Sequence, residues 1–181
     1  AGEDRENTLT KGSYYLTDAE IEMLDTVTES FSHTIVLMNV GGILDMAWTE
    51  RYGKKISALL YVWQGGMESG NAVADVLTGK VNPCGKLADT IAKRYEDYPS
   101  SKNFGGKEFN QYEEDIFVGY RYFETFGKEK VLYPFGYGLS YTQFQVLENE
   151  LVCEENGYRI NVTVENTGAY AGQEIVMAWC Q

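Results

Sequence analysis

Residues 65–87 read GGMESGNAVADVLTGKVNPCGKL, and this stretch decides the fold. Two glycines open it, and Gly79 with the pair Asn82 and Pro83 marks a second turn. The apolar positions between the two turns recur at helical spacing: Ala72, Val73, Val76 and Leu77. The pattern predicts a helix over residues 67–77, with Gly79 as the glycine that follows its C-terminus.

The chain before this stretch alternates between helical and strand patterns. Thr17 and Glu20 have the spacing of a capping box, which opens a helix. Residues 34–40 and 56–63 are apolar runs rich in branched side chains, which is typical of strands that are buried on both faces. Residues 43–51 between them predict a short amphipathic helix. The order helix, strand, helix, strand, helix predicts an α/β fold with a parallel sheet.

The pattern changes after residue 99. Residues 100–110 are polar and glycine-rich and predict a loop, and residues 112–126 are strongly aromatic. Further on, three segments alternate as strands do: residues 143–147, 158–165 and 174–179. An immunoglobulin-like sandwich takes about 7 strands. We therefore expect only the opening of a β-sandwich domain here.

Charge and composition exclude several classes of partner. The net charge is −12, which argues against nucleic acid and against anionic membrane surfaces, because both need a basic face on the protein. No apolar run is long enough for a transmembrane helix. The apolar fraction of 44% is ordinary for a globular protein and allows a hydrophobic core. A neutral partner such as a sugar fits this acidic chain.

The three cysteines are Cys84, Cys153 and Cys180, without the paired spacing of a zinc site. Buried free thiols are favoured over a disulfide, because a domain of this size rarely needs one, and this predicts a reducing, cytoplasmic compartment. The one histidine, His33, has no partner motif and is interpreted as structural.

The chemistry-bearing residues leave few reaction types open. Gly65 and Gly70 have the spacing of a phosphate loop, but Asn71 and Ala72 stand where that loop needs Lys and Ser or Thr. Carboxylates, aromatic rings and glycine turns remain. This set suits carbohydrate chemistry, since acids protonate or attack glycosidic bonds and rings stack on sugar faces.

Several motifs resemble glycoside hydrolase family 3, the β-glucosidase family. Residues 66–87 match the family pattern Gly-x-Glu-x-Gly-x-Ala-x-Ala-Asp-x-Leu-x-Gly-x-x-Asn-Pro-x-Gly-Lys-Leu almost from end to end, and residues 112–123 resemble Tyr-x-Glu-Gly-Ile-x-Val-Gly-Tyr-Arg-Tyr with Asp115 in place of Gly. Residues 133–144 resemble the linker into a fibronectin-like domain. The resemblance implies part of the α/β sandwich domain over residues 1–132. A truncated fibronectin type III-like β-sandwich would follow over residues 133–181.

The resemblance also implies a reaction. Family members are retaining enzymes in which a (β/α)8 barrel supplies an Asp nucleophile within Ser-Asp-Trp, and the sandwich domain supplies a Glu acid/base in a Ser/Ala-Gly-Glu loop. Residues 1–7 read AGEDREN and match that loop, so Glu3 is the predicted acid/base and Asp4 the runner-up carboxylate. Ser-Asp-Trp is absent from these residues. The nucleophile is therefore expected in a missing barrel of the same polypeptide, and the isolated chain is expected to be inactive.

The implied substrates are β-linked oligosaccharides or aryl β-glycosides that lose their non-reducing-end sugar, and no metal or organic cofactor is required. The exact sugar stays open, because β-xylosidases and N-acetylglucosaminidases belong to the same family. A second class also stays open, namely a non-catalytic carbohydrate-binding or interaction module. A flavodoxin-like nucleotide binder would need the phosphate loop that is lacking here.

Most of the matched residues are interpreted as architecture. In residues 66–87, Asp75 and Asn82 are expected to satisfy backbone groups around turns, with a second reading that places Gly65 to Glu68 on the rim of a sugar site. The aromatic residues 112–141 form either a wall for aglycone groups or a packed joint in which Arg121 pairs with Glu113 or Glu114. The three tryptophans are expected in the core rather than as sugar platforms: Trp48, Trp63 and Trp179.

Overall fold

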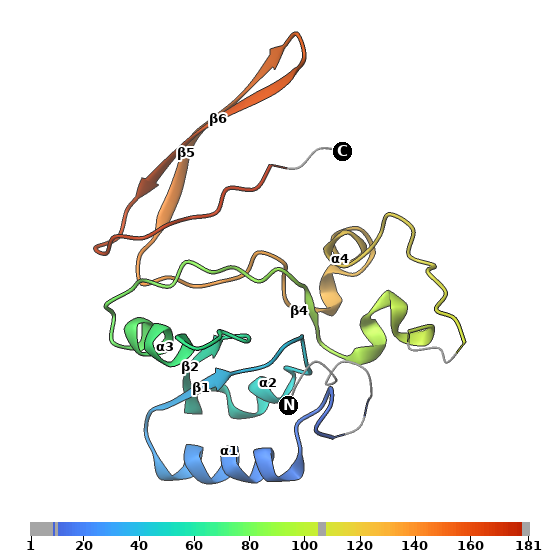
Figure 1. Cartoon of the computed structure of the whole chain (residues 1–181), viewed down its shortest axis with the longest axis vertical. Helices are drawn as coiled ribbons and strands as arrows, with labels where there is room; N and C mark the ends of the chain where they lie inside the picture. Colours follow the sequence, from blue (N-terminus) through green and yellow to red (C-terminus); the bar gives the residue numbers. More distant parts are fainter. Residues whose placement is uncertain (1–8, 10, 105–107, 179–181) are drawn as a thin grey trace. The chain divides into compact units, whose positions relative to one another are not determined.

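The computed structural model describes residues 9, 11–104 and 108–178. The chain forms two compact units, the first from Ala1–Ser69 and Leu87–Tyr137 and the second from Gly70–Lys86 and Gly138–Gln181. The described residues contain three two-stranded sheets, namely β1–β2, β3–β4 and β5–β6 (Figure 1). No helix in this described part of the chain is both long and apolar enough to cross a bilayer.

The first helix begins where its capping box predicts. α1 spans Asp18–Ser30, the Thr17 side chain accepts a hydrogen bond from the Glu20 amide at 3.2 Å, and the Glu20 carboxylate accepts one from the Thr17 amide at 2.8 Å. Both bonds satisfy donors that the first turn of a helix leaves free. Leu24 and Thr28 lie on the buried face of the helix.

The predicted parallel sheet is confirmed. β1 spans Thr34–Met38 and β2 spans Ile56–Tyr61, and the two strands pair in parallel from Thr34 beside Ile56 to Met38 beside Tyr61. Parallel strands need a crossover connection, and here α2, Trp48–Tyr52, with the short 3-10 helix η1, Gly53–Lys55, lies between them in sequence.

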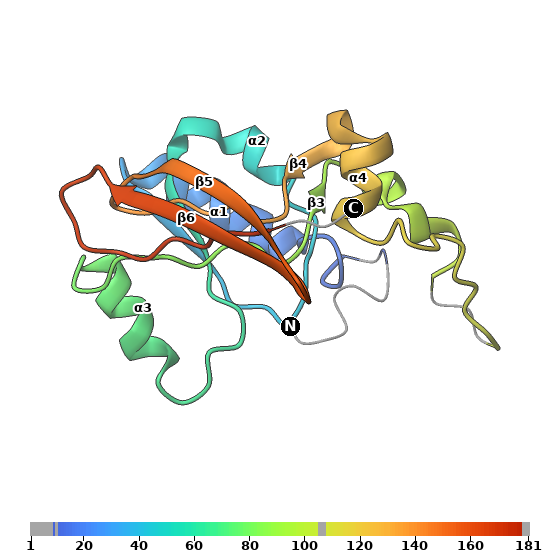
Figure 2. The same cartoon turned by 90° about the horizontal axis from the view of Figure 1, so that it is seen from above.

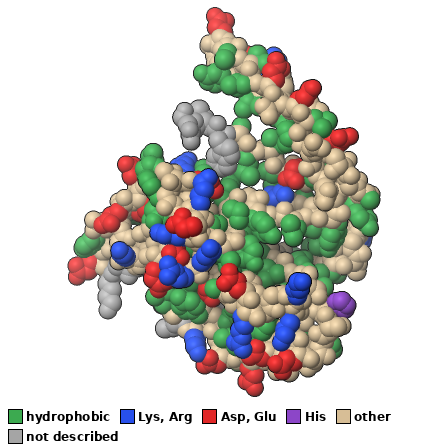
Figure 3. Space-filling model, turned by 180° about the vertical axis from the view of Figure 1, so that it is seen from behind, with side chains coloured by type: hydrophobic (Ala, Val, Ile, Leu, Met, Phe, Trp, Pro, Cys, Tyr) green, Lys and Arg blue, Asp and Glu red, His purple; other side chains and the backbone are tan. Residues whose placement is uncertain are grey.

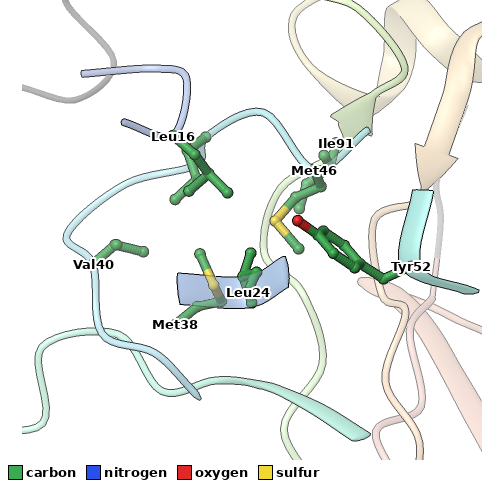
Figure 4. Packing of buried hydrophobic residues seen from close by; sticks show 8 residues of the cluster. Leu16, Leu24, Met38, Val40, Met46, Tyr52 and Ile91 are labelled. Atoms are coloured by element: carbon green, nitrogen blue, oxygen red, sulfur yellow. The ribbon is translucent and has the colours of Figure 1, made fainter. Parts of the chain in front are cut away.

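The core of the first unit gathers side chains from α1, the β1 end and the loops beside it. Figure 4 shows these side chains pointing toward one another. The buried members are Leu16, Leu24, Met38, Val40, Leu44, Met46, Tyr52 and Ile91. Burying one such side chain stabilises the fold by about 1.5–3 kcal/mol, so this cluster holds α1 against the sheet.

The helix predicted over residues 43–51 is wrong in its first half. Only α2 is helical, and Leu44 and Met46 are buried on either side of the half-buried Asp45. This alternation has the period of an extended chain rather than of a helix. Core burial of Leu44 and Met46 therefore overrides the amphipathic helical pattern.

The prediction that β1 is buried on both faces is also wrong. Thr34 and Met38 are buried, whereas Ile35 and Leu37 are 50% and 42% exposed. Apolar side chains also reach the surface elsewhere, among charged ones (Figure 3). Within the described residues the core covers one face of the strand only.

The rest of the first unit is short elements and aromatic rings. β3, Ile91–Ala92, pairs antiparallel with β4, Val131–Tyr133. The 3-10 helices η2, Tyr95–Asp97, and η3, Pro99–Lys102, precede α4, Tyr120–Phe126, and η4, Lys128–Lys130, follows it.

The aromatic joint is packed around α4. Phe123 is buried and meets Tyr98 edge-on at 5.8 Å between ring centroids. The expected pairing of Arg121 with Glu113 or Glu114 is not formed in the described residues. Its guanidinium lies 5.7 Å from the centre of the Tyr120 ring instead, because a guanidinium can stack on the neighbouring ring.

The second unit contains α3 and a long hairpin. α3 spans Ser69–Leu77, two residues shorter at its start than predicted, and Gly79 follows it with φ +75°, as its predicted capping role requires. β5, Phe144–Glu154, and β6, Gly157–Asn166, run side by side (Figure 1, Figure 2).

The strand predicted over residues 174–179 is not formed in its described part. Residues 174–178 form no ladder in the described chain, where β5 and β6 pair only with each other. Cys153 is exposed and Cys84 half-buried, both as free thiols, so the prediction of buried thiols is wrong for Cys153, which lies on the open hairpin. Cys180 lies outside the described residues.

Asn82 joins three segments of the second unit. Its side-chain oxygen accepts hydrogen bonds from the Ser140 hydroxyl and the Tyr141 amide, each at 2.8 Å. Its side-chain NH₂ donates to the Ala171 carbonyl at 3.0 Å. Asn82 thus satisfies backbone groups, as predicted, although in remote segments rather than in its own turn.

Lys86 and Asp75 complete the architectural part of the motif. The Lys86 ammonium donates to the Gly138 carbonyl at 2.9 Å and pairs with Glu174 at 3.2 Å, both in a largely buried setting. Asp75 pairs with the Lys80 ammonium at 3.0 Å instead of with backbone groups, because the cation lies within reach just beyond the helix end.

Replacing Asn82 with Ala should destabilise the protein by about 2 kcal/mol, since three bonds worth about 1 kcal/mol each are lost and water compensates in part. Asn82→Asp keeps the acceptor oxygen and should cost less. Thermal melting of both variants measures the difference. Equal melting temperatures for wild type and Asn82→Ala would contradict the role of this side chain.

Candidate functional site

The carboxyl ends of β1 and β2 lie at one edge of the sheet, because the strands are parallel. The pairing continues past the strand ends, where the Val62 amide donates to the Met38 carbonyl at 3.0 Å. Ligands of α/β proteins bind outside this edge. Two loops emerge here, residues 39–47 after β1 and residues 62–68 after β2.

The segment that leads into α1 lies beside the same loops. The Asp45 amide donates to the Tyr14 carbonyl at 3.0 Å, and Tyr14 is only 2% exposed. The Gly12 amide donates to the Tyr15 carbonyl at 2.8 Å and closes a turn. Leu16 enters the core (Figure 4). Residues 12–16 are therefore held at the carboxyl edge.

The two strand-end loops contact each other closely. The Tyr61 hydroxyl donates to the Gly42 carbonyl at 2.7 Å. At Gly41 an added Cβ would lie 2.8 Å from Nε2 of Gln64, so a side chain at this position would displace Gln64. A glycine at position 41 permits this close approach.

Trp63 has a strained backbone at the end of β2. Its φ is +52°, a left-handed conformation that costs a non-glycine residue about 1–3 kcal/mol and that clusters at functional sites. Its half-buried ring lies 4.5 Å from the Tyr61 ring, tilted by 51°. Trp48, by contrast, packs against the core cluster as predicted. The prediction that the tryptophans lie in the core thus fits Trp48 better than Trp63. Trp179 lies outside the described residues.

The loop between Trp63 and α3 is open to solvent. Gln64, Gly65, Gly66 and Glu68 are exposed, and Met67 is fully exposed. Gly66 has φ +70°, which turns the chain sharply ahead of the helix. The alternative prediction for residues 65–68 is a position on the rim of a sugar site.

The electrostatics of the edge are set by burial. Burial raises the pKa of Asp45, partly offset by a hydrogen bond that its carboxylate accepts from the Ala47 amide at 3.3 Å. Burial also raises the pKa of Tyr14 and of Tyr98, and the nearby Asp45 charge adds to both shifts. Both tyrosines therefore stay neutral, and the carboxyl group of Asp45 binds its proton more tightly than usual.

The other predicted site residues lie elsewhere. Glu3 and Asp4 fall outside the described residues. His33 is exposed before the first residue of β1, at the opposite edge of the sheet, with its Nδ1 3.4 Å from the Ser57 hydroxyl, consistent with a structural role. The described chain holds no group of three His, Cys, Asp or Glu side chains that could bind a metal.

Sequence reasoning missed Tyr14 and Asp45. The signal for Asp45 was a lone acid between two apolar residues just beyond a strand end, a position where polar groups often serve a site. Tyr14 carried no such signal, because its role depends on a backbone contact with a residue 31 positions later in the chain.

Comparison with known proteins identifies the family. The model of the glycosyl hydrolase family 3 C-terminal domain matches residues 1–141. A β-glucosidase from Ruminococcus albus is 49% identical over all of this chain, which covers 19% of that protein, and β-glucosidase A from Butyrivibrio fibrisolvens is 47% identical over 93% of this chain and 22% of its own length.

Solved structures agree. A β-glucosidase from Paenibacillus barengoltzii superposes with a TM-score of 0.85 at 53% identity, over 94% of this chain and 19% of its own. β-Glucosidase 3B from Thermotoga neapolitana, in complex with glucose, superposes with a TM-score of 0.82 at 40% identity. The match covers 92% of this chain and 24% of that chain. The chain belongs to the glycosyl hydrolase family 3 C-terminal domain family. It spans about a fifth of the length of the relatives it matches.

Replacing Asp45 with Asn should stabilise the protein at neutral pH. Because burial raises the folded-state pKa of this carboxyl, wild-type stability falls as the pH rises from the ordinary value of 3.8 through the raised pKa. Asn carries no charge and escapes this loss. Melting temperatures from pH 3 to 7 should diverge with rising pH, and a variant that is less stable at pH 7 would refute the expectation.

Proposed function

We propose that this chain is the part of a retaining β-glucosidase that supplies the acid/base Glu3. The Asp nucleophile would lie on a (β/α)8 barrel elsewhere in a longer polypeptide. The observation that carries the proposal is the 49% identity over the whole chain to a protein named β-glucosidase. The fivefold greater length of that protein leaves room for the barrel.

The anchored segment after Glu3 supports the assignment. Ser13, Tyr14 and Leu16 are buried at the carboxyl edge of the parallel strands, where α/β proteins bind ligands. Glu3 precedes this anchor by ten residues in the sequence. The Ala-Gly-Glu loop precedes this anchored segment in the sequence, which supports a position for its acid at the edge that would face a barrel.

The chemistry needs two carboxyl groups and a water molecule. In the first step Glu3 donates its proton to the glycosidic oxygen while the barrel Asp attacks the anomeric carbon, which breaks the bond to the leaving group. In the second step Glu3 takes a proton from a water molecule whose oxygen attacks the anomeric carbon. The bond to the Asp breaks, and the sugar leaves with retained configuration. The carboxyl groups of retaining enzymes stand about 5–5.5 Å apart.

Glu3 must also hold its proton near neutral pH. Desolvation under the barrel and the charge of the nucleophile both raise the pKa of a neighbouring carboxyl. The nucleophile loses its charge in the covalent intermediate, so the pKa of Glu3 then falls and the group becomes a base. A chain without the barrel lacks both the nucleophile and this tuning.

The sugar is proposed as glucose at the non-reducing end of a β-linked oligosaccharide or aryl β-glycoside. The names of the relatives favour glucose over xylose or N-acetylglucosamine. The mechanism uses carboxyl groups alone, so no metal or organic cofactor takes part.

Replacing Glu3 with Ala in the full-length polypeptide should lower kcat/KM for cellobiose by about 10²–10⁴-fold, the usual contribution of a general acid. Azide should restore turnover of an activated aryl β-glucoside and give β-glucosyl azide, because a small anion can attack the covalent intermediate without a base.

Asp4→Asn is the matched control and should retain most activity. Full activity of Glu3→Ala, or azide rescue of Asp4→Asn instead, would reject Glu3 as the acid/base. Hydrolysis by the 181-residue chain alone would reject the division of labour between two domains.

We further propose that β5 and β6 open a fibronectin type III-like β-sandwich. The hairpin has one apolar face, on which Leu151 lies beside Ile160 and Cys153 beside Tyr158. Leu151, Tyr158 and Ile160 are 61%, 73% and 48% exposed. A sandwich buries such a face against a second sheet, whereas the opposite face carries polar residues such as Arg159 and Thr163.

Ile160→Lys in the full-length polypeptide should cost about 3 kcal/mol or more, since a charge would enter the interior of the sandwich. Thr163→Lys, on the polar face beside Glu148, should change stability by less than about 0.5 kcal/mol. Thermal melting compares the two. Equal effects would show that no sheet covers the apolar face.

A further inference from the structure

We propose that the loop after β2, residues 62–68, receives the leaving-group ring of the glycoside, with Trp63 as its flat face and Met67 at its edge. The inference rests on the proposed function and names a part of the site that the carboxyl groups do not provide. The ligand is a pyranose or aryl ring attached through the glycosidic oxygen.

The loop after β2 lies at the edge where two other chain segments meet. The loop after β2 contacts the loop after β1 through the Tyr61 hydroxyl and the Gly42 carbonyl, 2.7 Å apart. The loop after β1 in turn holds the segment that follows Glu3, through the Asp45 amide and the Tyr14 carbonyl, 3.0 Å apart. Three chain segments thus meet at one edge of one sheet, within the first unit.

The general acid of a glycosidase stands on a defined side of the glycosidic bond. A general acid protonates the oxygen that joins the sugar to its leaving group, so it stands on the leaving-group side of the bond. Protein groups beside the acid therefore contact the leaving group rather than the sugar held by the nucleophile. Because the proposed function puts the Glu3 carboxyl at this edge, residues there would fall on the leaving-group side.

The backbone and the ring of Trp63 are held in place before any ligand binds. Its left-handed backbone, φ +52°, persists in a residue type that does not favour it. Its ring is braced by the Tyr61 ring at 4.5 Å, and the hydroxyl of Tyr61 is itself fixed by a hydrogen bond. An indole held in this way loses little side-chain entropy when a ligand binds to it.

Met67 is fully exposed to solvent. This large apolar side chain has no cover at all, although it lies four residues from Trp63 in a loop with two glycines. A thioether packs favourably against the edge of a ring and adapts to its shape. Trp63 and Met67 thus suit a ring of varied chemistry, which a leaving-group site must accept.

The experiment compares glycosides that share the sugar and differ in the leaving group. In the full-length polypeptide, kcat/KM is measured for cellobiose, 4-nitrophenyl β-glucoside and methyl β-glucoside. Trp63→Leu should lower kcat/KM about tenfold or more for the two ring leaving groups and less than about threefold for methanol. Met67→Ser should shift the ratio in the same direction, by about two- to fivefold.

Trp48→Phe is the matched control, since Trp48 packs against the core cluster, and it should leave the ratio between the three glycosides unchanged. Because Met67 is fully exposed, Met67→Ser decides the question should Trp63→Leu fail to fold. Equal losses for all three glycosides, or no loss for any, would overturn the inference while leaving the proposed function intact. A full-length wild type that hydrolyses none of the three would overturn both.

Discussion

The parallel pairing of β1 with β2 is the constraint on which the candidate site depends. It brings residues 39–47 and 62–68 to a single edge, although the two segments are separated by α2 and a whole strand. An antiparallel pairing would send one of these loops to the opposite edge. The backbone bond between Asp45 and Tyr14 then adds the segment before α1, so that Tyr14, Asp45 and Trp63 belong to segments that meet at this edge.

The two units leave apolar surface that the described residues do not cover. Ile35 and Leu37 on β1, together with the apolar face of the β5–β6 hairpin, are exposed to an extent that isolated domains avoid. A two-stranded parallel sheet is also unusual, since parallel sheets are buried on both faces. These features are consistent with a chain that spans about a fifth of the length of its relatives.

Local rules predicted much of the fold. The capping box at Thr17, the glycine after α3 and the parallel order of β1 and β2 each follow from a few neighbouring residues. Residues 43–47 and 174–178 could not be predicted in this way, because burial of Leu44 and Met46, or the absence of a partner strand, decides their conformation. At the site, sequence placed the loop after β2 at the rim but not the strain at Trp63, which only tertiary contacts can maintain.

The central claim is that Glu3 completes a pocket whose other half belongs to a barrel. A crystal structure of the full-length polypeptide with a thio-linked glucose disaccharide, which resists hydrolysis, measures this directly. The account predicts that the Glu3 carboxyl lies within hydrogen-bond reach of the linking sulfur and about 5–5.5 Å from the carboxyl of the nucleophile. A Glu3 side chain that faces solvent, or a carboxyl separation near 10 Å, would contradict it.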